Sequence, residues 1–481
     1  MMYYQEPLRP QIHYSPAKNW INDPNGLVYF DGEYHLFYQR NPFGNDHHHM
    51  HWGHAVSEDL FHWKELDIAL EPDELGTIFS GSAVVDTNNT SGLFNGPNGG
   101  LVAIFTHDGT SQQQSIAYSE DKGRTWTKYE HNPVLPNTDI KDFRDPKVFW
   151  HQNTQKWVML LACGDHIQIY TSPNLIEWSY QSSFGQDYGS YEGVWECPDL
   201  FPLSVEDSSE QVWVLIVSMN AGGPNGGSAV QYFTGDFDGV QFYPNESPDD
   251  PLKWVDDGKD FYASITWYNT EETYWIGWMN NWQYAGVVPV SPWRSSMSIV
   301  RQLSLKKVND KYVLKQQPVV PSVNVNHKQN NDVTIKEGTN QQLPISLPAS
   351  VNITINEKSN SKCWGLILIS DKNEEFTIHF HLDKDIYTFE RRDGSIDFSS
   401  DFPGNITGSL KGLATNQVFC LLDYSSIEIF VNGGVSVSTN VMYPKGKINQ
   451  IRVFSDHKEL VLDDIEINEY PSIWSSRESH V

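Results

Sequence analysis

The chain is short of the features that mark several common classes of protein. Its 481 residues include only four cysteines, too few for a disulfide framework and without the spacing of a zinc site, so we expect mostly buried free thiols at Cys163, Cys197, Cys363 and Cys420. Basic residues number 33 against 61 acidic residues, which gives a formal net charge of −28. Such a surface repels phosphate backbones and anionic lipid, so we expect no nucleic-acid partner. A neutral substrate such as a sugar is compatible with it.

Long apolar runs are also missing. No stretch of about 18 or more apolar residues is present, so no membrane span is expected. The segment Met1–Pro7 does not combine a basic region with an apolar run, and we therefore expect no signal peptide in this chain. The protein is then either cytoplasmic or secreted with its signal removed. No long segment shows sustained helical periodicity, so helices are not expected to dominate.

Strand patterns are what the sequence has instead. Leu27–Phe30 and Tyr34–Tyr38 are rich in strand-forming residues and flank Asp31–Glu33, which contains a glycine, so we expect a hairpin. Two further pairs follow the same pattern: Lys147–Trp150 with Trp157–Leu161, and Phe261–Tyr268 with Thr273–Met279.

A faint repeat accompanies these strands. A polar turn that ends in an aromatic residue recurs at Ser57–Trp63, Ser119–Trp126, Ser172–Trp178 and, in degenerate form, Asp236–Phe242. The spacing of the aromatic ends is near 60 residues, which predicts propeller blades, about five of them with four strands each. They would occupy residues 1–310. An ordinary all-β domain with chance turns is the alternative.

The composition of the sequence changes after this first domain. Residues 311–335 are polar and are predicted to form a linker. Residues 336–481 contain short alternating strands, such as Phe376–Phe380 and Ser426–Val431, with turn residues between them, which predicts a β-sandwich. The predicted fold class is therefore all-β, a five-bladed β-propeller followed by a C-terminal β-sandwich.

Three acidic motifs lie just before predicted strands of the first domain. They are Trp20–Gly26 with Asp23 in it, Phe143–Pro146 with Asp145, and Trp195–Asp199 with Glu196. Proline or glycine restricts or shapes the backbone at these points, so each carboxylate can be aimed. Because equivalent strand starts converge on the axis of a propeller, we expect the three carboxylates to share one pocket.

Cleavage of a glycosidic bond needs such a set of carboxylates. One attacks the anomeric carbon and another protonates the leaving oxygen, and in retaining enzymes the two lie about 5–5.5 Å apart. The acid must keep its proton near the working pH, which burial or a like-charged neighbour favours. For each motif alone, a turn or a capping carboxylate is the simpler interpretation. The three together favour a catalytic site.

The three motifs, in this order, resemble those of glycoside hydrolase family 32, which comprises invertases, exo-inulinases and levanases. Supporting stretches are Phe37–Gln39, His51–Ala55 and Phe79–Ser82. The resemblance covers nearly the whole chain and implies a five-bladed propeller with a C-terminal β-sandwich. It also implies a retaining β-fructofuranosidase that hydrolyses terminal non-reducing β-D-fructofuranosyl residues of sucrose, of fructo-oligosaccharides or of fructans such as inulin and levan, and that uses no cofactor and no metal.

The resemblance assigns roles residue by residue. It implies that Asp23 is the nucleophile, Glu196 the general acid/base and Asp145 the transition-state stabiliser. It also implies two groups of substrate-binding residues: Asn22, Gln39, Ser80 and Arg144 for the fructose hydroxyls, and Trp52, Phe79 and Trp282 for an apolar wall against the sugar C–H face.

The chain departs from the family pattern in two places. Ile21 replaces the common methionine of the first motif, a volume-conserving change. More notably, Asn45–His51 is rich in histidine, and His47 stands where many relatives carry tryptophan, which leaves the preference among sucrose, inulin and levan open. No carboxylate-spaced ligand motif surrounds these histidines, so we interpret them as loop or subsite-lining residues rather than a metal site.

Two other functions remain open at this point. A fructosyltransferase would use the same three carboxylates but pass fructose to a sugar instead of water. A non-catalytic carbohydrate-binding propeller would have no need of all three. The C-terminal domain resembles a lectin-like sandwich, and its expected role is packing against the propeller or a contact in a homo-oligomer.

Overall fold

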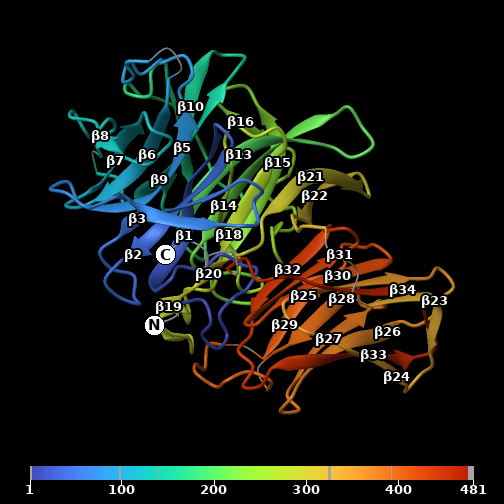
Figure 1. Ribbon diagram of the computed structural model, residues 1–481. Coiled ribbons are helices and arrows are strands. Elements are labelled where there is room, and N and C mark those ends of the chain that lie inside the picture. The colour runs from blue at the N-terminus through green and yellow to red at the C-terminus, as the bar shows by residue number, and fades with distance from the viewer. Residues whose placement is uncertain are drawn as a thin grey trace.

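The computed structural model describes residues 3–96, 99–137, 139–322, 327–391, 393–402 and 404–474. Within these ranges the only helical element is the short 3-10 turn Ala285–Val287, and every other element is a β-strand. Figure 1 shows two bodies: the strands drawn from blue to yellow form one, and those drawn from orange to red form the other. In the part of the chain described here, no helix is long and apolar enough to cross a membrane.

The first body is a propeller of five sheets in the described residues. The innermost strands of the blades contact one another in chain order, and the last contacts the first, which closes the ring. The predicted five-bladed arrangement is thereby confirmed. The innermost strands are β1 (Asn19–Phe30), β5 (Thr77–Val85), β9 (Phe143–His151), β13 (Trp195–Ser204) and β17 (Tyr262–Thr266).

Outer strands follow each innermost strand in antiparallel order, except that β19 of the first blade pairs with β1 in parallel. The first blade adds β2 (Glu33–Asn41), β3 (His51–Ser57), β4 (Lys64–Leu70) and, on the other side of β1, β19 (Trp293–Arg294). The second adds β6 (Leu101–Asp108), β7 (Gln112–Ser119) and β8 (Thr127–Lys128). The third adds β10 (Lys156–Cys163), β11 (Ile167–Ser172) and β12 (Ser179–Phe184). The fourth adds β14 (Gln211–Met219), β15 (Ala229–Phe237) and β16 (Phe242–Pro244). The fifth adds β18 (Tyr274–Met279), β20 (Ser296–Met297), β21 (Arg301–Val308) and β22 (Lys311–Pro318).

The three predicted hairpins form as expected. In the first, Tyr29 pairs with Tyr34, and the turn between them uses the left-handed backbone at Asp31 and Gly32, with φ of 48° and 89°. Gly32 fits this position because it has no Cβ to clash in that conformation. The other two hairpins are β9 with β10 and β17 with β18.

The second body is a sandwich of two sheets with six strands each in the described residues. One sheet contains β23 (His327–Ile335), β34 (Leu460–Glu469), β25 (Ala349–Ile355), β30 (Gln417–Asp423), β31 (Ser426–Val431) and β32 (Ser436–Val441). The other contains β24 (Asn340–Pro344), β33 (Ile448–His457), β26 (Cys363–Ser370), β27 (Glu375–His381), β28 (Ile386–Glu390) and β29 (Asn405–Ser409). Inward side chains of both sheets form one buried core, to which Trp364, Phe380 and Ile429 belong.

The structure corrects the predicted boundary at residue 310 and the linker predicted over residues 311–335. Lys311–Pro318 is strand β22, which pairs along its whole length with β21 and completes the fifth blade. His327–Ile335 is strand β23 of the sandwich. The segment looked like a linker because β22 is the outer strand of its blade and is mostly polar, and only Leu314 and Gln316 in it are buried.

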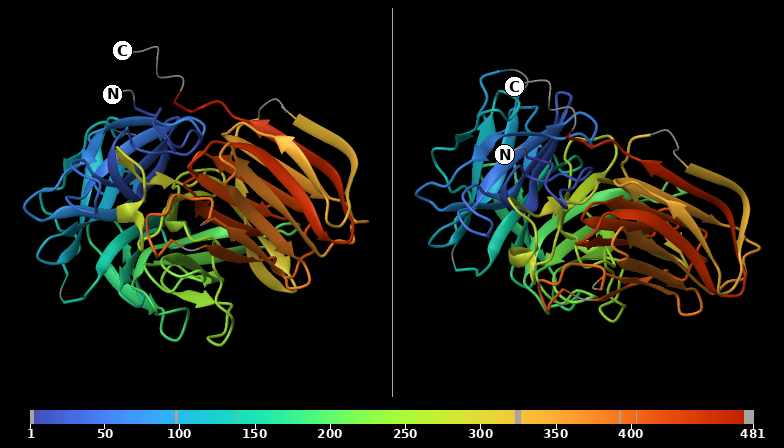
Figure 2. Two further views of the ribbon diagram at one scale, coloured as in Figure 1. Left: turned by 90° about the horizontal axis from the view of Figure 1, so that it is seen from below. Right: turned by 60° about the horizontal axis from the view of Figure 1, so that its bottom comes forward.

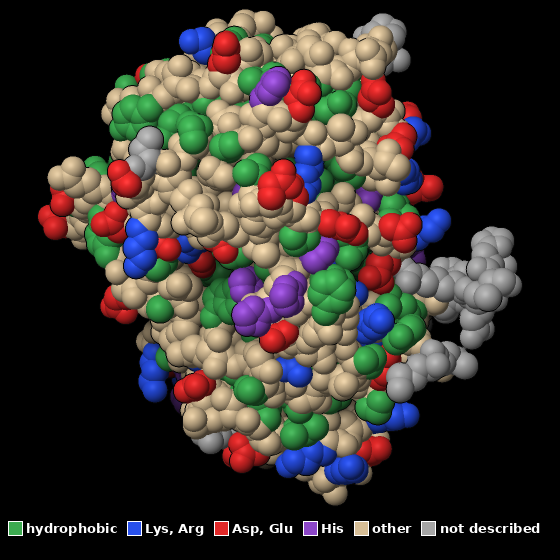
Figure 3. Space-filling model, turned by 90° about the vertical axis from the view of Figure 1, so that its left-hand side faces the viewer, with side chains coloured by type: hydrophobic (Ala, Val, Ile, Leu, Met, Phe, Trp, Pro, Cys, Tyr) green, Lys and Arg blue, Asp and Glu red, His purple; other side chains and the backbone are tan. Residues whose placement is uncertain are grey.

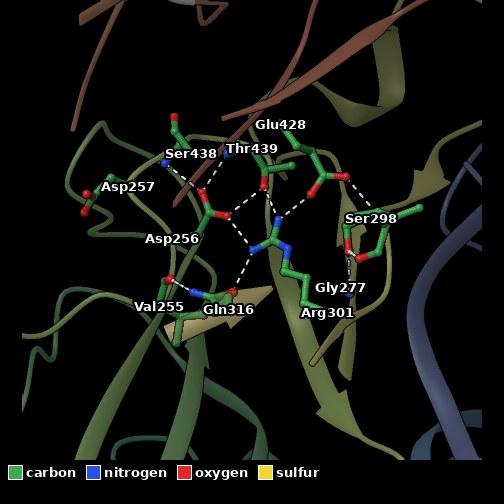
Figure 4. A network of polar contacts seen from close by, with 12 residues as sticks. Val255, Asp256, Asp257, Gly277, Ser298, Arg301, Gln316, Glu428, Ser438 and Thr439 are labelled. Carbon is green, nitrogen blue, oxygen red and sulfur yellow. Dashed lines mark hydrogen bonds and ion pairs between the residues drawn. The ribbon is translucent and has the colours of Figure 1, made fainter. Parts of the chain in front are cut away.

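Polar groups join the two bodies in a buried interface, which the views in Figure 2 show to be broad. Arg301 of the propeller donates to Asp256 Oδ2 at 3.0 Å and to Glu428 Oε2 of the sandwich at 2.5 Å. Asp256 in turn accepts the backbone N–H of Thr439 at 2.8 Å. Figure 4 shows this network crossing from one body to the other. The sandwich is therefore packed against the propeller by specific contacts, as expected, whereas a contact in a homo-oligomer stays a prediction.

Candidate active site

The backbone of every innermost strand is irregular near its first residues. The antiparallel register shifts there in all five blades. A β-bulge of this kind turns a side chain away from its regular direction. The residues in the irregular steps are Asn22–Asp23, Phe79–Ser80, Asp145–Pro146, Cys197–Pro198 and Ala263–Ser264. Five equivalent bulges at the same end of adjacent strands bring these side chains together on the propeller axis.

Asp23 lies in the first of these bulges and is held by two neighbours. The Asn22 amide donates to Asp23 Oδ1 at 3.0 Å, and the Ser80 hydroxyl donates to Oδ2 at 2.7 Å. Trp20 fixes Asn22, because its indole N–H donates to the Asn22 side-chain oxygen at 2.7 Å. Each carboxylate oxygen of Asp23 therefore has a defined direction.

Glu196 comes from the fourth blade and is held by an arginine and a tyrosine. Arg144 donates to Glu196 Oε1 at 2.9 Å, and its other terminal nitrogen donates to Asp142 Oδ1 at 2.8 Å. The Tyr262 hydroxyl of the fifth blade donates to Glu196 Oε2. Blades three, four and five thus meet at this carboxyl group.

Cys197, which directly follows Glu196 in the chain, lies against both Asp23 and Asp145. The backbone N–H of Cys197 donates to Asp145 Oδ2 at 3.0 Å. The thiol of Cys197 lies 3.5 Å from Asp23 Oδ2 and 3.6 Å from Asp145 Oδ2. Both residues have a left-handed backbone, with φ of 62° for Asp145 and 45° for Cys197. Non-glycine residues in this region are strained, and such strain concentrates at functional sites.

Burial and mutual repulsion shift the proton affinity of this cluster. Burial and the nearby Asp23 raise the pKa of Glu196, while Arg144 and the Tyr262 hydroxyl oppose the rise. Burial, with Glu196 and Asp23 close by, raises the pKa of Asp145 to about 7 against the opposing effect of Arg144. Glu196 and Asp145 are therefore both suited to hold a proton, which general acid catalysis requires of one carboxyl group in the site.

An aromatic wall borders the carboxylates. Phe79 and Trp282 are partly exposed, and both pack on the apolar cluster that includes Trp20. Trp52, predicted for this wall, has no exposed surface and donates from its indole to the Phe79 backbone oxygen at 2.9 Å. The structure corrects that prediction, because the strand β3 is buried throughout and Trp52 supports Phe79 from behind.

Gln39 lies in the strand that pairs with β1. It is buried in β2, and its amide donates to the Asn25 side-chain oxygen at 2.9 Å. Hydrogen bonds join Asn22, Asp23 and Ser80, ion pairs join Arg144, Asp145 and Glu196, and the Cys197 thiol lies against both groups. Phe79 and Trp282 pack beside them, Trp52 supports the wall, and a contact of Gln39 with the sugar stays a prediction.

The histidine-rich loop between β2 and β3 reaches the same wall. The His47 ring contacts Trp282, Phe79 and Trp20 edge-on, with centroid distances of 5.3, 5.9 and 6.3 Å. His47–His49 are exposed, and histidine side chains gather at the middle of the face drawn in Figure 3. Among the described residues, no group of three or more His, Cys, Asp or Glu side chains is placed to hold a metal ion. The structure supports a lining role for His47.

Sequence reasoning missed three members of the cluster. Tyr262, Cys197 and Asp142 each bind a group of the site across blades or within a bulge. A signal for Tyr262 was present, since it begins the innermost strand of the fifth blade, at the position where the other four blades carry site residues.

Comparison with known proteins agrees with this geometry. The description "Glycosyl hydrolases family 32 N-terminal domain" matches residues 13–318, and "Glycosyl hydrolases family 32 C terminal" matches residues 316–469. The chain is 44% identical over 490 residues to a levanase of Bacillus subtilis (strain 168), covering 98% of this chain and 72% of the relative. It is 37% identical to invertase 2 of Saccharomyces cerevisiae, covering 90% of this chain and 89% of that protein.

Solved structures give the same result. The exo-inulinase of Aspergillus awamori superimposes with a TM-score of 0.91 at 34% identity, over 98% of this chain and all of that one (100%). A β-fructofuranosidase of Schwanniomyces occidentalis, complexed with fructosyl-erythritol, gives a TM-score of 0.89 at 34% identity, over 97% of this chain and 98% of that one.

Proposed function

The chain belongs to glycosyl hydrolases family 32, and from this premise we propose that it is a retaining β-fructofuranosidase that removes terminal fructose from sucrose and from fructans. The relatives support this substrate class, since they are named levanase, exo-inulinase and invertase. The observation that carries the mechanism is the clustering of Asp23, Asp145 and Glu196 around the Cys197 bulge. Hydrogen-bond donors fix Asp23, and the surroundings of Glu196 raise its pKa.

Asp23 acts as the nucleophile. One of its carboxylate oxygens attacks the anomeric C2 carbon of the fructosyl ring and forms an ester as the bond to the leaving oxygen breaks. The donors on its two oxygens, Asn22 and Ser80, hold the carboxylate in one orientation, so the attacking oxygen needs little rearrangement.

Glu196 acts first as acid and then as base. It transfers its proton to the glycosidic oxygen as that bond breaks, so the departing sugar leaves as an alcohol. It then takes a proton from water, whose oxygen attacks C2 and releases fructose from Asp23. Arg144 and Tyr262 hold the carboxyl group through both steps.

Asp145 binds hydroxyls of the fructosyl ring and stabilises the positive charge that develops at C2. It is 6% exposed and close enough to the other two carboxylates that, together with burial, they raise its pKa to about 7. Its ionised form, which a positive charge at C2 favours, acts in a poorly hydrated site where electrostatic effects are strong. Phe79, Trp282 and His47 supply the surface against the sugar ring.

A hollow near the residues that precede Glu196 offers space for the departing sugar. This hollow of about 560 Å³ lies between the third and fourth blades and is lined by Asp142, Val194 and Asn220, among others. Val194 is two residues from Glu196, and Asp142 shares Arg144 with it. We assign the leaving group of sucrose, or the next unit of a fructan, to this hollow.

The function is tested by incubating the protein with sucrose, inulin and levan side by side. We expect free fructose from the first time point, and NMR should show it in the β-configuration before mutarotation. At dilute substrate, no oligosaccharide longer than the substrate should form. Asp23→Asn and Glu196→Gln are expected to reduce release by roughly 10³-fold or more. Longer oligosaccharides as the main product would favour the fructosyltransferase, and an α-configured first product would contradict the retaining mechanism.

A further inference from the structure

We propose that the β-sandwich positions the active site through Arg391, a buried arginine that holds the two propeller segments carrying Tyr262 and Trp282. The proposal rests on the function assigned above. It gives the sandwich a part in the reaction beyond packing against the propeller.

Arg391 directly follows strand β28 and extends into the propeller. Its side chain is fully buried and donates to Asp260 Oδ2 at 2.5 Å and to the Tyr284 hydroxyl at 2.9 Å. The Tyr284 hydroxyl donates to the other oxygen of Asp260. Arg391, Asp260 and Tyr284 therefore form a closed triangle, with the sandwich at one corner and the propeller at the other two.

Further contacts tie this triangle to the sandwich. Arg391 donates to the Val441 backbone oxygen at 2.8 Å, and the Val441 N–H donates to Asp260 Oδ2 at 2.9 Å. The guanidinium lies over the Phe402 ring at 4.0 Å from its centroid. All three corners are buried, and each makes at least two hydrogen bonds, so none of them can shift without breaking a buried polar contact.

The two propeller corners stand next to the catalytic machinery. Asp260 is two residues before Tyr262, whose hydroxyl donates to Glu196. Tyr284 is two residues after Trp282, which lies in the aromatic wall. Asn281 ties the two segments together, because its amide donates to the Lys259 backbone oxygen at 2.7 Å. A displacement of the triangle is therefore transmitted to the acid/base and to the wall.

Arg301 provides a matched comparison in the same interface. It is also a fully buried arginine that pairs with carboxylates from both bodies, Asp256 and Glu428 (Figure 4). Its hydrogen-bond partners lie further from Tyr262 along the chain. Its guanidinium touches the Tyr262 segment by lying over the Phe261 ring, 4.3 Å from the centroid. Loss of either arginine leaves buried carboxylates without their cation and destabilises the fold. Arg391 hydrogen-bonds to both segments of the site, whereas methionine in place of Arg301 keeps the apolar packing on Phe261.

The test compares Arg391→Met, Arg391→Lys and Arg301→Met by kcat/KM against pH on sucrose, with Tm measured for each. We expect Arg391→Met to lower kcat/KM at least tenfold and to move the alkaline limb of the profile to higher pH, because Tyr262 no longer holds the carboxylate form of Glu196. Arg391→Lys should recover part of both effects. Arg301→Met should lower Tm by a similar amount with kcat/KM within twofold and an unshifted profile.

Tyr284→Phe is the milder variant, since it removes a single hydroxyl and is expected to fold even if Arg391→Met does not. It should shift the alkaline limb in the same direction by a smaller amount. An unshifted profile in Arg391→Met, or in Tyr284→Phe where the former does not fold, would overturn the proposal, and so would an equal shift in Arg301→Met. Failure of the proposed function is a separate result, because the unmodified protein would then release no fructose.

Discussion

The carboxylates of the site depend on backbone irregularities as much as on side-chain chemistry. Asp145 and Cys197 adopt left-handed φ angles of 62° and 45° next to prolines. A regular strand would direct alternate side chains to the two faces of a blade. The bulges instead turn Asp23 and Asp145 toward the axis, where they meet Glu196.

The most informative single-residue change is Tyr262→Phe, which removes only the hydroxyl that donates to Glu196. That bond stabilises the carboxylate form, so its loss raises the pKa of Glu196 further. The acid form then persists to higher pH, and the alkaline limb of kcat/KM should move upward. We expect kcat to fall about tenfold, since a hydrogen bond to a charged group is worth roughly 1.5–3 kcal/mol. Steady-state kinetics across pH measures both effects, and an alkaline limb that stays in place would contradict this role.

The acidic members of the site and their partners Asn22, Ser80 and Arg144 were predictable from sequence, whereas Tyr262, Cys197 and Asp142 were missed. Asp23 and Asp145 each directly precede a proline at the start of a strand pattern, and Glu196 lies two residues before a proline. The local sequence therefore marks all three. Tyr262 reaches Glu196 across 66 residues of chain, and its one signal in the sequence is its place at the start of the fifth innermost strand. Trp52 was predicted for the wall but is fully buried. The sequence around an aromatic residue in a strand does not distinguish a side chain that lines a pocket from one that is buried behind it.

At the scale of elements, the repeat seen in the sequence has a simple structural origin. Ser57 with Asp59, Ser119 with Asp121, and Ser172 with Asn174 form the same turn between the third and fourth strands of successive blades. In each, the acid or amide oxygen accepts backbone N–H groups of the turn. The number of blades could be predicted because this turn recurs, and the extent of the fifth could not because its outer strand is polar.

Below the site, a buried ion pair joins three innermost strands. Lys147 of β9 lies 3.0 Å from Asp199 of β13, and Asp199 accepts the backbone N–H of Thr266 of β17 at 2.7 Å. Lys147 also donates to the Thr266 backbone oxygen at 2.6 Å. These contacts hold blades three, four and five at the spacing that the Glu196 contacts need.

Asp199→Ala should therefore destabilise the protein strongly, because it leaves the Lys147 ammonium buried without its counter-ion. We expect a loss of about 3–5 kcal/mol in the free energy of unfolding, measured by denaturant titration followed by tryptophan fluorescence. The double variant Lys147→Met with Asp199→Leu should recover part of this loss, since no unpaired charge remains. A loss below about 1 kcal/mol in Asp199→Ala would show that the pair does not hold the blades together.

At the scale of the whole molecule, the segment before β1 is clamped between the two bodies. His13 is fully buried, with Nδ1 2.8 Å from Asp423 and Nε2 2.9 Å from Glu428, both in the sandwich. Burial lowers the pKa of His13, but its bonds to the two carboxylates outweigh that effect and raise it to about 9. His13 is therefore a cation at neutral pH, held by two anions.

This clamp predicts alkaline lability. The folded-state pKa lies above the ordinary value of about 6.5, so the stabilisation is complete below pH 6.5 and is lost as pH rises through about 9. The difference corresponds to ~3 kcal/mol. Calorimetric Tm should fall between these pH values in the unmodified protein, and much less in His13→Asn, which is less stable at neutral pH. Parallel Tm curves for the two proteins would contradict the assignment.

Fructose release by this protein depends on Asp23 bonding covalently to fructose while Glu196 transfers the proton. The direct measurement is mass spectrometry of Glu196→Gln after brief exposure to β-D-fructofuranosyl fluoride, whose leaving group needs no acid and whose ester then lacks a base for hydrolysis. We predict one added fructosyl unit on the peptide that contains Asp23, and none in Asp23→Asn. Turnover of the fluoride with the adduct on Asp145, or with no adduct, would contradict the mechanism.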